Sequence, residues 1–161
     1  STPGIGSTFV ITLPFEKAEE TDISSEPESE RNSIQGIKIL LAEDNDLNAE
    51  IAEFILEDMG LIVDRVEDGI QCVARIEQKP AGTYDLILMD IQMPNMDGYK
   101  ATQTIRRLAD EKKACIPIIA MTANAFEEDA RKCVEAGMNA HLSKPLQMDV
   151  VVGTIAEYYK R

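Results

Sequence analysis

The chain has 161 residues, a formal net charge of −13 and a hydrophobic fraction of 44%. This length and composition allow one buried core, so we expect a single domain with a short appendage. The strong negative charge argues against a surface for nucleic acids or anionic membranes, and no apolar run approaches membrane-spanning length. Because the chain begins with Ser1, we expect it to be a piece of a longer protein.

Three zones follow one another along the chain. Residues 1–15 combine two glycines with the apolar run 9–13, which predicts a single strand after a glycine turn. Residues 16–36 contain seven acidic residues, two basic ones and very few apolar ones, so this zone is expected to be a flexible linker. Residues 37–161 show regular apolar patterns, which predict the folded domain.

Strand-like and helix-like patterns alternate through the third zone. In chain order, the expected elements are a strand at 37–42, a helix at 47–59, a strand at 61–66, a helix at 69–78, a strand at 84–89, a helix at 99–112, a strand at 116–121, a helix at 126–136, a strand at 140–142 and a helix at 148–159. The first helix is built around Leu47, Ile51, Phe54, Ile55 and Met59. Five strand–helix repeats are the signature of an α/β fold, here (βα)5, with a doubly wound five-stranded parallel sheet. The expected strand order is the flavodoxin-like one, 2-1-3-4-5.

The cysteines indicate the redox compartment. Cys72, Cys115 and Cys133 are odd in number, widely spaced and in apolar surroundings. This pattern fits reduced, buried thiols in a cytoplasmic protein better than a disulfide framework or a zinc site.

Acidic side chains directly follow two of the predicted strands. Glu43 and Asp44 come after the first strand, and Asp90 comes after the third. These two strand ends are neighbours in a 2-1-3-4-5 sheet, so the three carboxylates are expected to converge on one crevice. Their mutual repulsion favours a hard cation, and Mg²⁺ binds a few carboxylates together with water and phosphate oxygens. Taken alone, Asp44 could instead cap a helix, Asp90 could cap a turn and Glu43 could be a solvated surface residue.

Two more polar residues lie at the same predicted edge. Thr122 follows the fourth strand and Lys144 the fifth, although each alone could be an ordinary strand-end or surface residue. A hydroxyl, an ammonium group and a metal ion together suit a phosphoryl group, because they bind its oxygens and balance their charge. Asp90 is then the candidate nucleophile, since carboxylates can form an aspartyl phosphate.

These residues resemble the receiver (response-regulator) domain of two-component signalling. The resemblance covers residues 37–161, and the motifs that show it are 43–45 with Asn48, 90–98, 122–123 and 144–145. It implies that Asp90 is the phosphoacceptor, that Asp44, Asp90 and the Gln92 backbone carbonyl bind Mg²⁺ with Glu43 assisting through water, that Thr122 is the switch hydroxyl, and that Lys144 binds the phosphoryl group. It also implies a cis peptide bond before Pro145.

One position departs from the commonest form of the family. The switch aromatic, three residues before Lys144, is usually Tyr or Phe, and here it is His141. The smaller, polar ring puts its coupling to Thr122 in doubt. As the only histidine, His141 could suggest a metal ligand or a phosphohistidine, but its place in the motif already explains it.

The resemblance also implies the partner and the location. The phosphoryl donor is expected to be a phosphohistidine on the dimerisation domain of a histidine kinase or on a histidine-containing phosphotransfer protein. Neither nucleic acid nor direct membrane contact is expected of this chain. The expected location is the cytoplasm, on a parent protein that could be membrane-anchored.

The first zone carries a second resemblance. Residues 4–14 are similar to the closing glycine box and last strand of a histidine-kinase ATP-binding domain. The chain would then be the tail of a hybrid histidine kinase, with a kinase remnant at 1–15, an acidic linker at 16–36 and a receiver at 37–161. This piece is not expected to phosphorylate itself from ATP, because it lacks the phosphoaccepting histidine and most of an ATP site.

Two other functions share parts of the pattern. A phosphohydrolase of the haloacid-dehalogenase type uses similar groups, but it normally has a second Asp two residues after the nucleophile, where this chain has Gln92. Gln92 cannot donate the proton that such an enzyme needs. A phosphorylation-independent pseudo-receiver would lack one or more pocket residues, whereas all are present here. Constitutive binding of partners by this domain stays open as the alternative.

Overall fold

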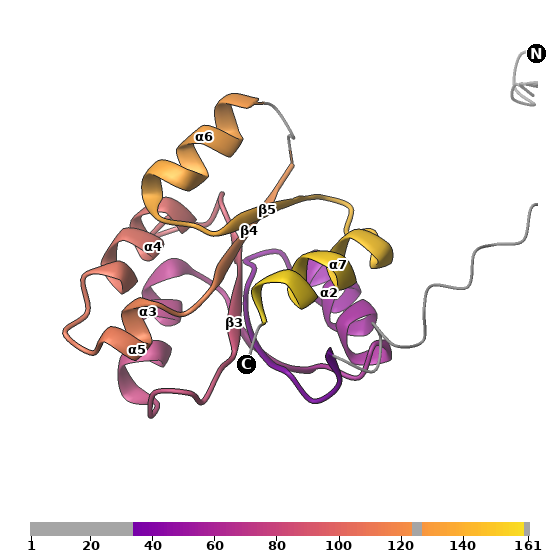
Figure 1. Cartoon of the computed structure of the whole chain (residues 1–161). Coiled ribbons are helices and arrows are strands. Elements are labelled where there is room, and N and C mark those ends of the chain that lie inside the picture. The colour runs from indigo at the N-terminus through magenta and orange to yellow at the C-terminus, as the bar shows by residue number, and fades with distance from the viewer. Residues whose placement is uncertain (1–33, 124–126, 160–161) are drawn as a thin grey trace, which may run out of the picture.

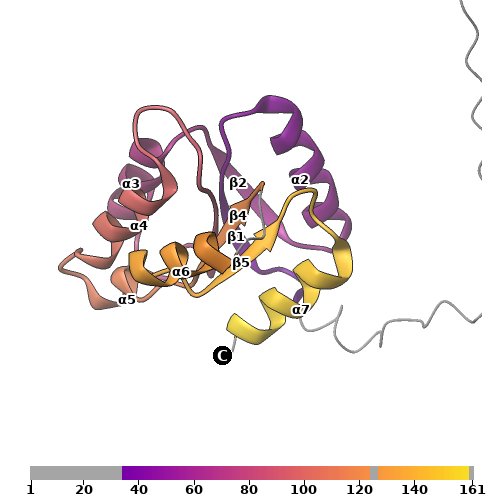
Figure 2. The ribbon, with the colours of Figure 1, turned by 90° about the horizontal axis from the view of Figure 1, so that it is seen from above.

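The computed structural model describes residues 34–123 and 127–159. Five parallel strands form one sheet in the order β2-β1-β3-β4-β5 (Figures 1 and 2). The strands are β1 (Lys38–Ala42), β2 (Ile62–Val66), β3 (Leu86–Asp90), β4 (Ile118–Thr122) and β5 (Ala140–Ser143). The helices are α2 (Asp46–Asp58), α3 (Gly69–Gln78), α4 (Gly98–Arg106), α5 (Glu111–Ala114), α6 (Glu127–Ala136) and α7 (Met148–Tyr158). The predicted fold class and strand order are therefore confirmed.

Helices cover both faces of the sheet, and each face has its own core. Figure 2 shows α2 and α7 on one face and α3, α4, α5 and α6 on the other. Ile39, Leu41 and Leu88 point to the first face, while their neighbours Leu40, Ile87 and Met89 point to the second. Because both faces are covered, β3 and β4 are buried along their whole length. This explains why their sequences are continuous apolar runs rather than alternating ones.

The buried face of α2 differs from the apolar stripe seen in the sequence. Ala49, Ala52 and Leu56 pack against the sheet, and small alanine side chains allow the helix to lie close to it. Three larger residues from the predicted stripe point outward, with exposed fractions of 65% for Leu47, 49% for Ile51 and 71% for Phe54. The helix was therefore predicted correctly, but its buried face only in part, since Ile55 and Met59 of the stripe do pack on the core.

The third predicted helix is in fact two helices. α4 ends at Arg106, and α5 begins after Asp110, whose side chain accepts hydrogen bonds from the backbone N–H groups of Lys112 and Lys113. Arg106 donates to the carbonyl oxygens of Ala114 and Ile116, both at 2.7 Å. These contacts fold the chain back toward β4, so one continuous helix over 99–112 cannot form.

The prediction of three buried thiols was wrong for one of them. All three cysteines are free; Cys72 and Cys133 are buried, while Cys115 is exposed. Burial raises the pKa of the Cys72 thiol to about 12, so this thiol stays protonated. Cys115 is exposed because it caps the short helix α5 at the surface.

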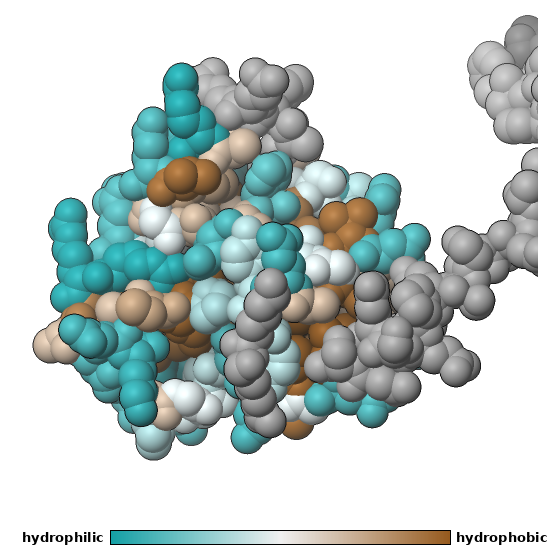
Figure 3. Space-filling model, in the orientation of Figure 1, coloured by the Kyte–Doolittle hydropathy of each residue, from teal (hydrophilic) through white to brown (hydrophobic). Residues whose placement is uncertain are grey.

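The outer surface is mainly polar. Figure 3 shows hydrophilic residues over most of one face, with smaller apolar areas between them, in keeping with the net charge of −13. Within the described ranges, no helix is both long and apolar enough to cross a membrane.

The N-terminal predictions fall largely outside the described residues. The strand predicted within 1–15, most of the linker 16–36 and the first residue of the helix at 126–136 belong to this group. Ile34, at the end of the expected linker, is fully buried in the core beside Ile37 and Leu61. The folded unit therefore includes residues 34–36.

Candidate functional site

The carboxyl ends of four strands surround one pocket of about 300 Å³. Its lining includes six residues predicted for the site, namely Glu43, Asp44, Asp90, Gln92, Thr122 and Lys144. His141 does not line it and is exposed on β5, in register with Ala120 of β4. Parallel strands bring these residues together because their carboxyl ends meet at the same edge of the sheet.

Three carboxylates in the pocket form a possible metal site. Oxygen atoms of Glu43, Asp44 and Asp90 all lie within 4.8 Å of one another. Glu43 and Asp90 are buried, with exposed fractions of 1% and 7%, whereas Asp44 is exposed. Hard oxygen donors in this number, with one open side, fit Mg²⁺, which keeps several waters and binds through a few carboxylates.

Lys144 joins the two buried carboxylates. Its Nζ donates to Asp90 Oδ2 at 2.8 Å and also to Glu43 Oε2. Burial raises the pKa of Asp90 above its ordinary value, and Lys144 opposes this rise. Burial alone would lower the pKa of Lys144, but its bonds to the two acids hold that pKa above the ordinary value. The pocket therefore keeps a cation beside the carboxylate proposed to react.

Glu43 is held in position by two residues for which no such contact was predicted. Asn48 Nδ2, on the first turns of α2, donates to Glu43 Oε1 at 3.1 Å. Arg65 of β2 donates to the Glu43 backbone carbonyl at 3.2 and 3.3 Å and to Asp46 Oδ1 at 2.8 Å. Asn48 belongs to the family motif, but nothing in the local sequence indicates the role of Arg65, because its partners lie about two elements away.

The loop after Asp90 is fixed by close packing against two helix N-termini. A Cβ atom on Gly98 would lie 2.3 Å from the carbonyl oxygen of Asp90, and one on Gly69 would lie 2.5 Å from that of Met96. Asn95, with φ of 61°, donates through Nδ2 to Asp68 Oδ2 at 2.7 Å. These contacts hold the loop that carries Gln92 at the rim of the pocket.

The far side of the pocket comes from β4 and the chain after β5. Thr122, the last residue of β4, is buried, and its carbonyl oxygen accepts a hydrogen bond from the Lys144 N–H at 2.8 Å. The Lys144–Pro145 peptide bond is cis, the isomer that the resemblance implies. Tyr99 also lines the pocket, and no sequence pattern indicates this beyond its place next to Gly98.

Comparison with known proteins identifies the family. A family model described as "Response regulator receiver domain" matches residues 39–156. The chain belongs to this family. In this receiver domain the matched segment includes every predicted site residue and ends within α7.

Several known proteins are similar to this receiver domain. Sensor protein EvgS of Escherichia coli K12 is 33% identical over 99% of the chain, which spans 13% of EvgS. The receiver domain of sensor histidine kinase PA1611 from Pseudomonas aeruginosa is 42% identical, with a TM-score of 0.69 over 77% of this chain and 98% of that one. Its crystal structure has a magnesium ion coordinated in the active site cleft. Across the curated relatives considered, the chain spans between 6% and 16% of the full length.

A third relative was crystallised with a partner. The receiver domain of the response regulator Ssk1, in a co-crystal with the histidine phosphotransfer protein Ypd1 of Saccharomyces cerevisiae, is 27% identical to this chain. The TM-score is 0.69, and the match covers 78% of this chain and 90% of that one.

Proposed function

We propose that this receiver domain accepts a phosphoryl group from a phosphohistidine onto Asp90 of its pocket. The observation that supports this most directly is the contact of buried Asp90 with Lys144 beside two further carboxylates. The P–N bond to the donor imidazole breaks while a P–O bond to one Asp90 oxygen forms, so the phosphoryl group changes carrier without an added reactant. The product is an acyl phosphate, which water or another histidine can later accept.

Different pocket residues would stabilise the negative charge of the transferring phosphoryl group. Lys144 is placed to bind phosphoryl oxygens, because its Nζ already lies 2.8 Å from Asp90 Oδ2. Thr122 would donate its hydroxyl to another of these oxygens, and this attraction would draw β4 and the residues after it toward the pocket. Asp44, Asp90 and the Gln92 carbonyl would hold Mg²⁺, which would supply positive charge near the transferring group. Glu43, bonded to Asn48 and Lys144, would keep the lysine in place.

Phosphoryl labelling tests the assignment of Asp90. The chain is incubated with a small acyl phosphate or phosphoramidate donor and Mg²⁺, and the phosphorylated fraction is measured by intact-mass spectrometry. We expect Asp90→Asn to abolish labelling, because the amide is not a nucleophile, and we expect chelation of Mg²⁺ to suppress it. Asp58→Asn, at an exposed position near the end of α2, is the matched control and should label normally. Undiminished labelling of Asp90→Asn would disprove the proposed site.

A surface on α2 is suited to the phosphohistidine donor. The exposed residues Leu47, Ile51 and Phe54 lie on the helix whose N-terminal end borders the pocket. A groove of about 80 Å³ that includes Ile51 and Leu146 connects this surface with Lys144. Clustered exposed apolar side chains mark interaction sites, and we propose that a histidine-containing phosphotransfer domain or kinase dimerisation domain docks here.

The docking surface can be tested separately from the chemistry. Phe54→Glu should slow phosphotransfer from a panel of phosphorylated histidine-phosphotransfer proteins by tenfold or more, since loss of a buried aromatic anchor costs about 2 kcal/mol or more. Labelling by a small donor should stay unchanged, because the pocket is intact. Ile70→Glu, half-exposed on α3 across the sheet, is the control and should transfer normally. Equal rates for both variants would contradict docking on α2.

We also propose the parentage and location of the chain. The match to EvgS over 99% of the chain supports a hybrid sensor histidine kinase as parent, with residues 1–15 as a kinase remnant and 16–33 as the linker. A receiver that takes phosphoryl groups from such a kinase works in the cytoplasm. The coding sequence upstream of Ser1 tests this proposal, because it should encode a histidine-kinase core.

A further inference from the structure

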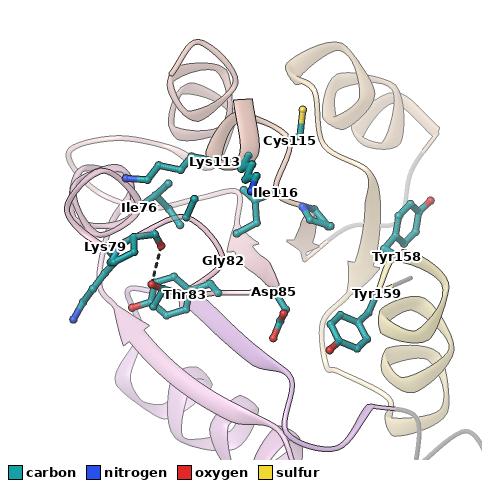
Figure 4. A pocket seen from close by; sticks show the side chains of 15 residues that line it. Ile76, Lys79, Gly82, Thr83, Asp85, Lys113, Cys115, Ile116, Tyr158 and Tyr159 are labelled. Carbon is teal, nitrogen blue, oxygen red and sulfur yellow. Dashed lines mark hydrogen bonds between the residues drawn. The ribbon is translucent and has the colours of Figure 1, made fainter. Parts of the chain in front are cut away.

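A second cavity lies at the amino-terminal ends of the strands, opposite the Asp90 pocket. It has a volume of about 370 Å³ and is lined by the end of α3, the loop before β3, α5 and the end of α7 (Figure 4). This is the amino-terminal edge of the strands, whereas the phosphorylation pocket lies at their carboxyl ends. None of the residues of that pocket lines this second cavity.

The cavity carries positive charge on an otherwise acidic protein. Lys79, Lys112 and Lys113 contribute to its lining, and Asp85 is its single acidic residue. None of these lysines forms an ion pair with a carboxylate in the described part of the chain. Lys113 Nζ instead donates to the Glu77 carbonyl oxygen at 2.7 Å. Three lysines against one acidic lining residue, on a chain of net charge −13, favour an acidic ligand.

The remaining walls are apolar and aromatic. Figure 4 shows Lys79 and Lys113 on one side of the cavity and Tyr158 and Tyr159 on the opposite side. Ile76 and Ile116, both buried, lie on the side of the lysines. A segment with many carboxylates and occasional apolar residues would match this combination of walls.

We propose that the acidic segment 16–33 of the same chain binds in this cavity. The segment holds seven acidic and two basic residues, with Ile23 as an apolar residue near its middle. It joins the folded unit close by, since Ile34 is buried next to β1 and the Lys38 N–H donates to the Asp85 side chain in the cavity wall at 2.8 Å. Because the segment is attached this close to the cavity, its effective concentration there is high. Docking at this edge leaves the Asp90 pocket open, so the proposal stands independently of the phosphoacceptor role.

Zero-length carbodiimide cross-linking of the full chain tests the contact directly. The reagent joins a lysine to a carboxylate only where the two touch. We expect cross-links from Glu16–Glu30 carboxylates to concentrate on Lys79, Lys112 and Lys113 and to be absent from Lys100, which is exposed at the start of α4. Cross-links spread equally over Lys100, or missing from all three cavity lysines, would overturn the proposal.

Charge reversal gives a second measurement that does not depend on the reagent. In the full chain, Lys79→Glu/Lys112→Glu should make a glutamate-specific protease cut within 16–30 several-fold faster than in wild type, and Lys100→Glu should not. The difference should vanish at about 1 M salt, where the screening length is about 3 Å. Unchanged cleavage in a folded double variant would overturn the proposal. The cross-linking is also repeated on a mixture of isotope-labelled and unlabelled chains. Cross-links found only between a labelled and an unlabelled chain would place the segment on a second molecule and would also overturn the proposal.

Discussion

Asp64 is held by two neighbours from different elements. Arg75 of α3 and Tyr84, just before β3, both donate to its Oδ2. Burial alone would raise the pKa of Asp64, but the bonds from Tyr84 and Arg75 hold that pKa below its ordinary value of 3.8. The carboxylate therefore ties β2, α3 and the start of β3 together.

Acid should weaken this link. Because the pKa of Asp64 is lowered in the folded state, its contribution is complete above the unfolded value and is lost as the pH falls through the folded one. We expect Asp64→Asn to lower the free energy of unfolding by about 1 kcal/mol at neutral pH, since the group is partly solvated. Urea denaturation should show this difference shrinking below about pH 4. A difference that stays constant with pH would contradict the assignment, and Asp58→Asn is the control.

At the scale of elements, the N-terminus of α4 holds the loop after Asp90 in place. α4 begins at Gly98, where the backbone passes so close to Asp90 that a Cβ would meet its carbonyl oxygen at 2.3 Å. The helix and the strand end are thereby joined without an intervening side chain. Gly153, in the middle of α7, has no heavy atom within 4 Å of such a Cβ.

These two glycines predict opposite effects of the same substitution. Gly98→Ala should lower the free energy of unfolding by about 1–3 kcal/mol, because the new methyl group forces the backbone apart. Gly153→Ala should raise it by roughly 0.5–1 kcal/mol, because alanine favours the helix and nothing obstructs it. Urea denaturation of both variants measures the two changes. Similar stabilities for the two variants would show that the close approach at Gly98 is unimportant.

The two sides of α2 have different roles, one in packing against the sheet and one in the proposed docking of the donor. One side, with Ala49, Ala52 and Leu56, packs on the sheet, while Leu47 and Phe54 face outward. Large apolar residues on the outer side contribute little to the core of this domain. Their place beside the phosphorylation pocket is the reason for proposing them as the donor's docking surface.

At the scale of the whole molecule, the two edges of the sheet have different chemistry. The carboxyl ends of the strands hold three acids beside Lys144, which suits a metal ion and a phosphoryl group. The amino-terminal ends border a cavity with three lysines on one side and two tyrosines on the other, which suits an acidic segment. The sheet separates the two sites, so a linker docked at one edge would not obstruct a phosphohistidine donor at the other.

The sequence by itself determined the order of elements and the residues at the strand ends. All five strands lie within two residues of their predicted bounds, because buried parallel strands are short apolar runs that local patterns reveal. Asp90, Thr122 and Lys144 could be found because each lies at or directly beyond a strand end, and parallel strands place these ends together.

Only the tertiary structure decided which faces and partners these elements use. The outward turn of Phe54, the bond from Arg65 to Glu43 and the division of the third helix depend on contacts between residues far apart in the chain. The lysine-rimmed cavity likewise joins α3, α5 and α7. Local patterns record which residues are apolar or charged, but packing selects which of them meet.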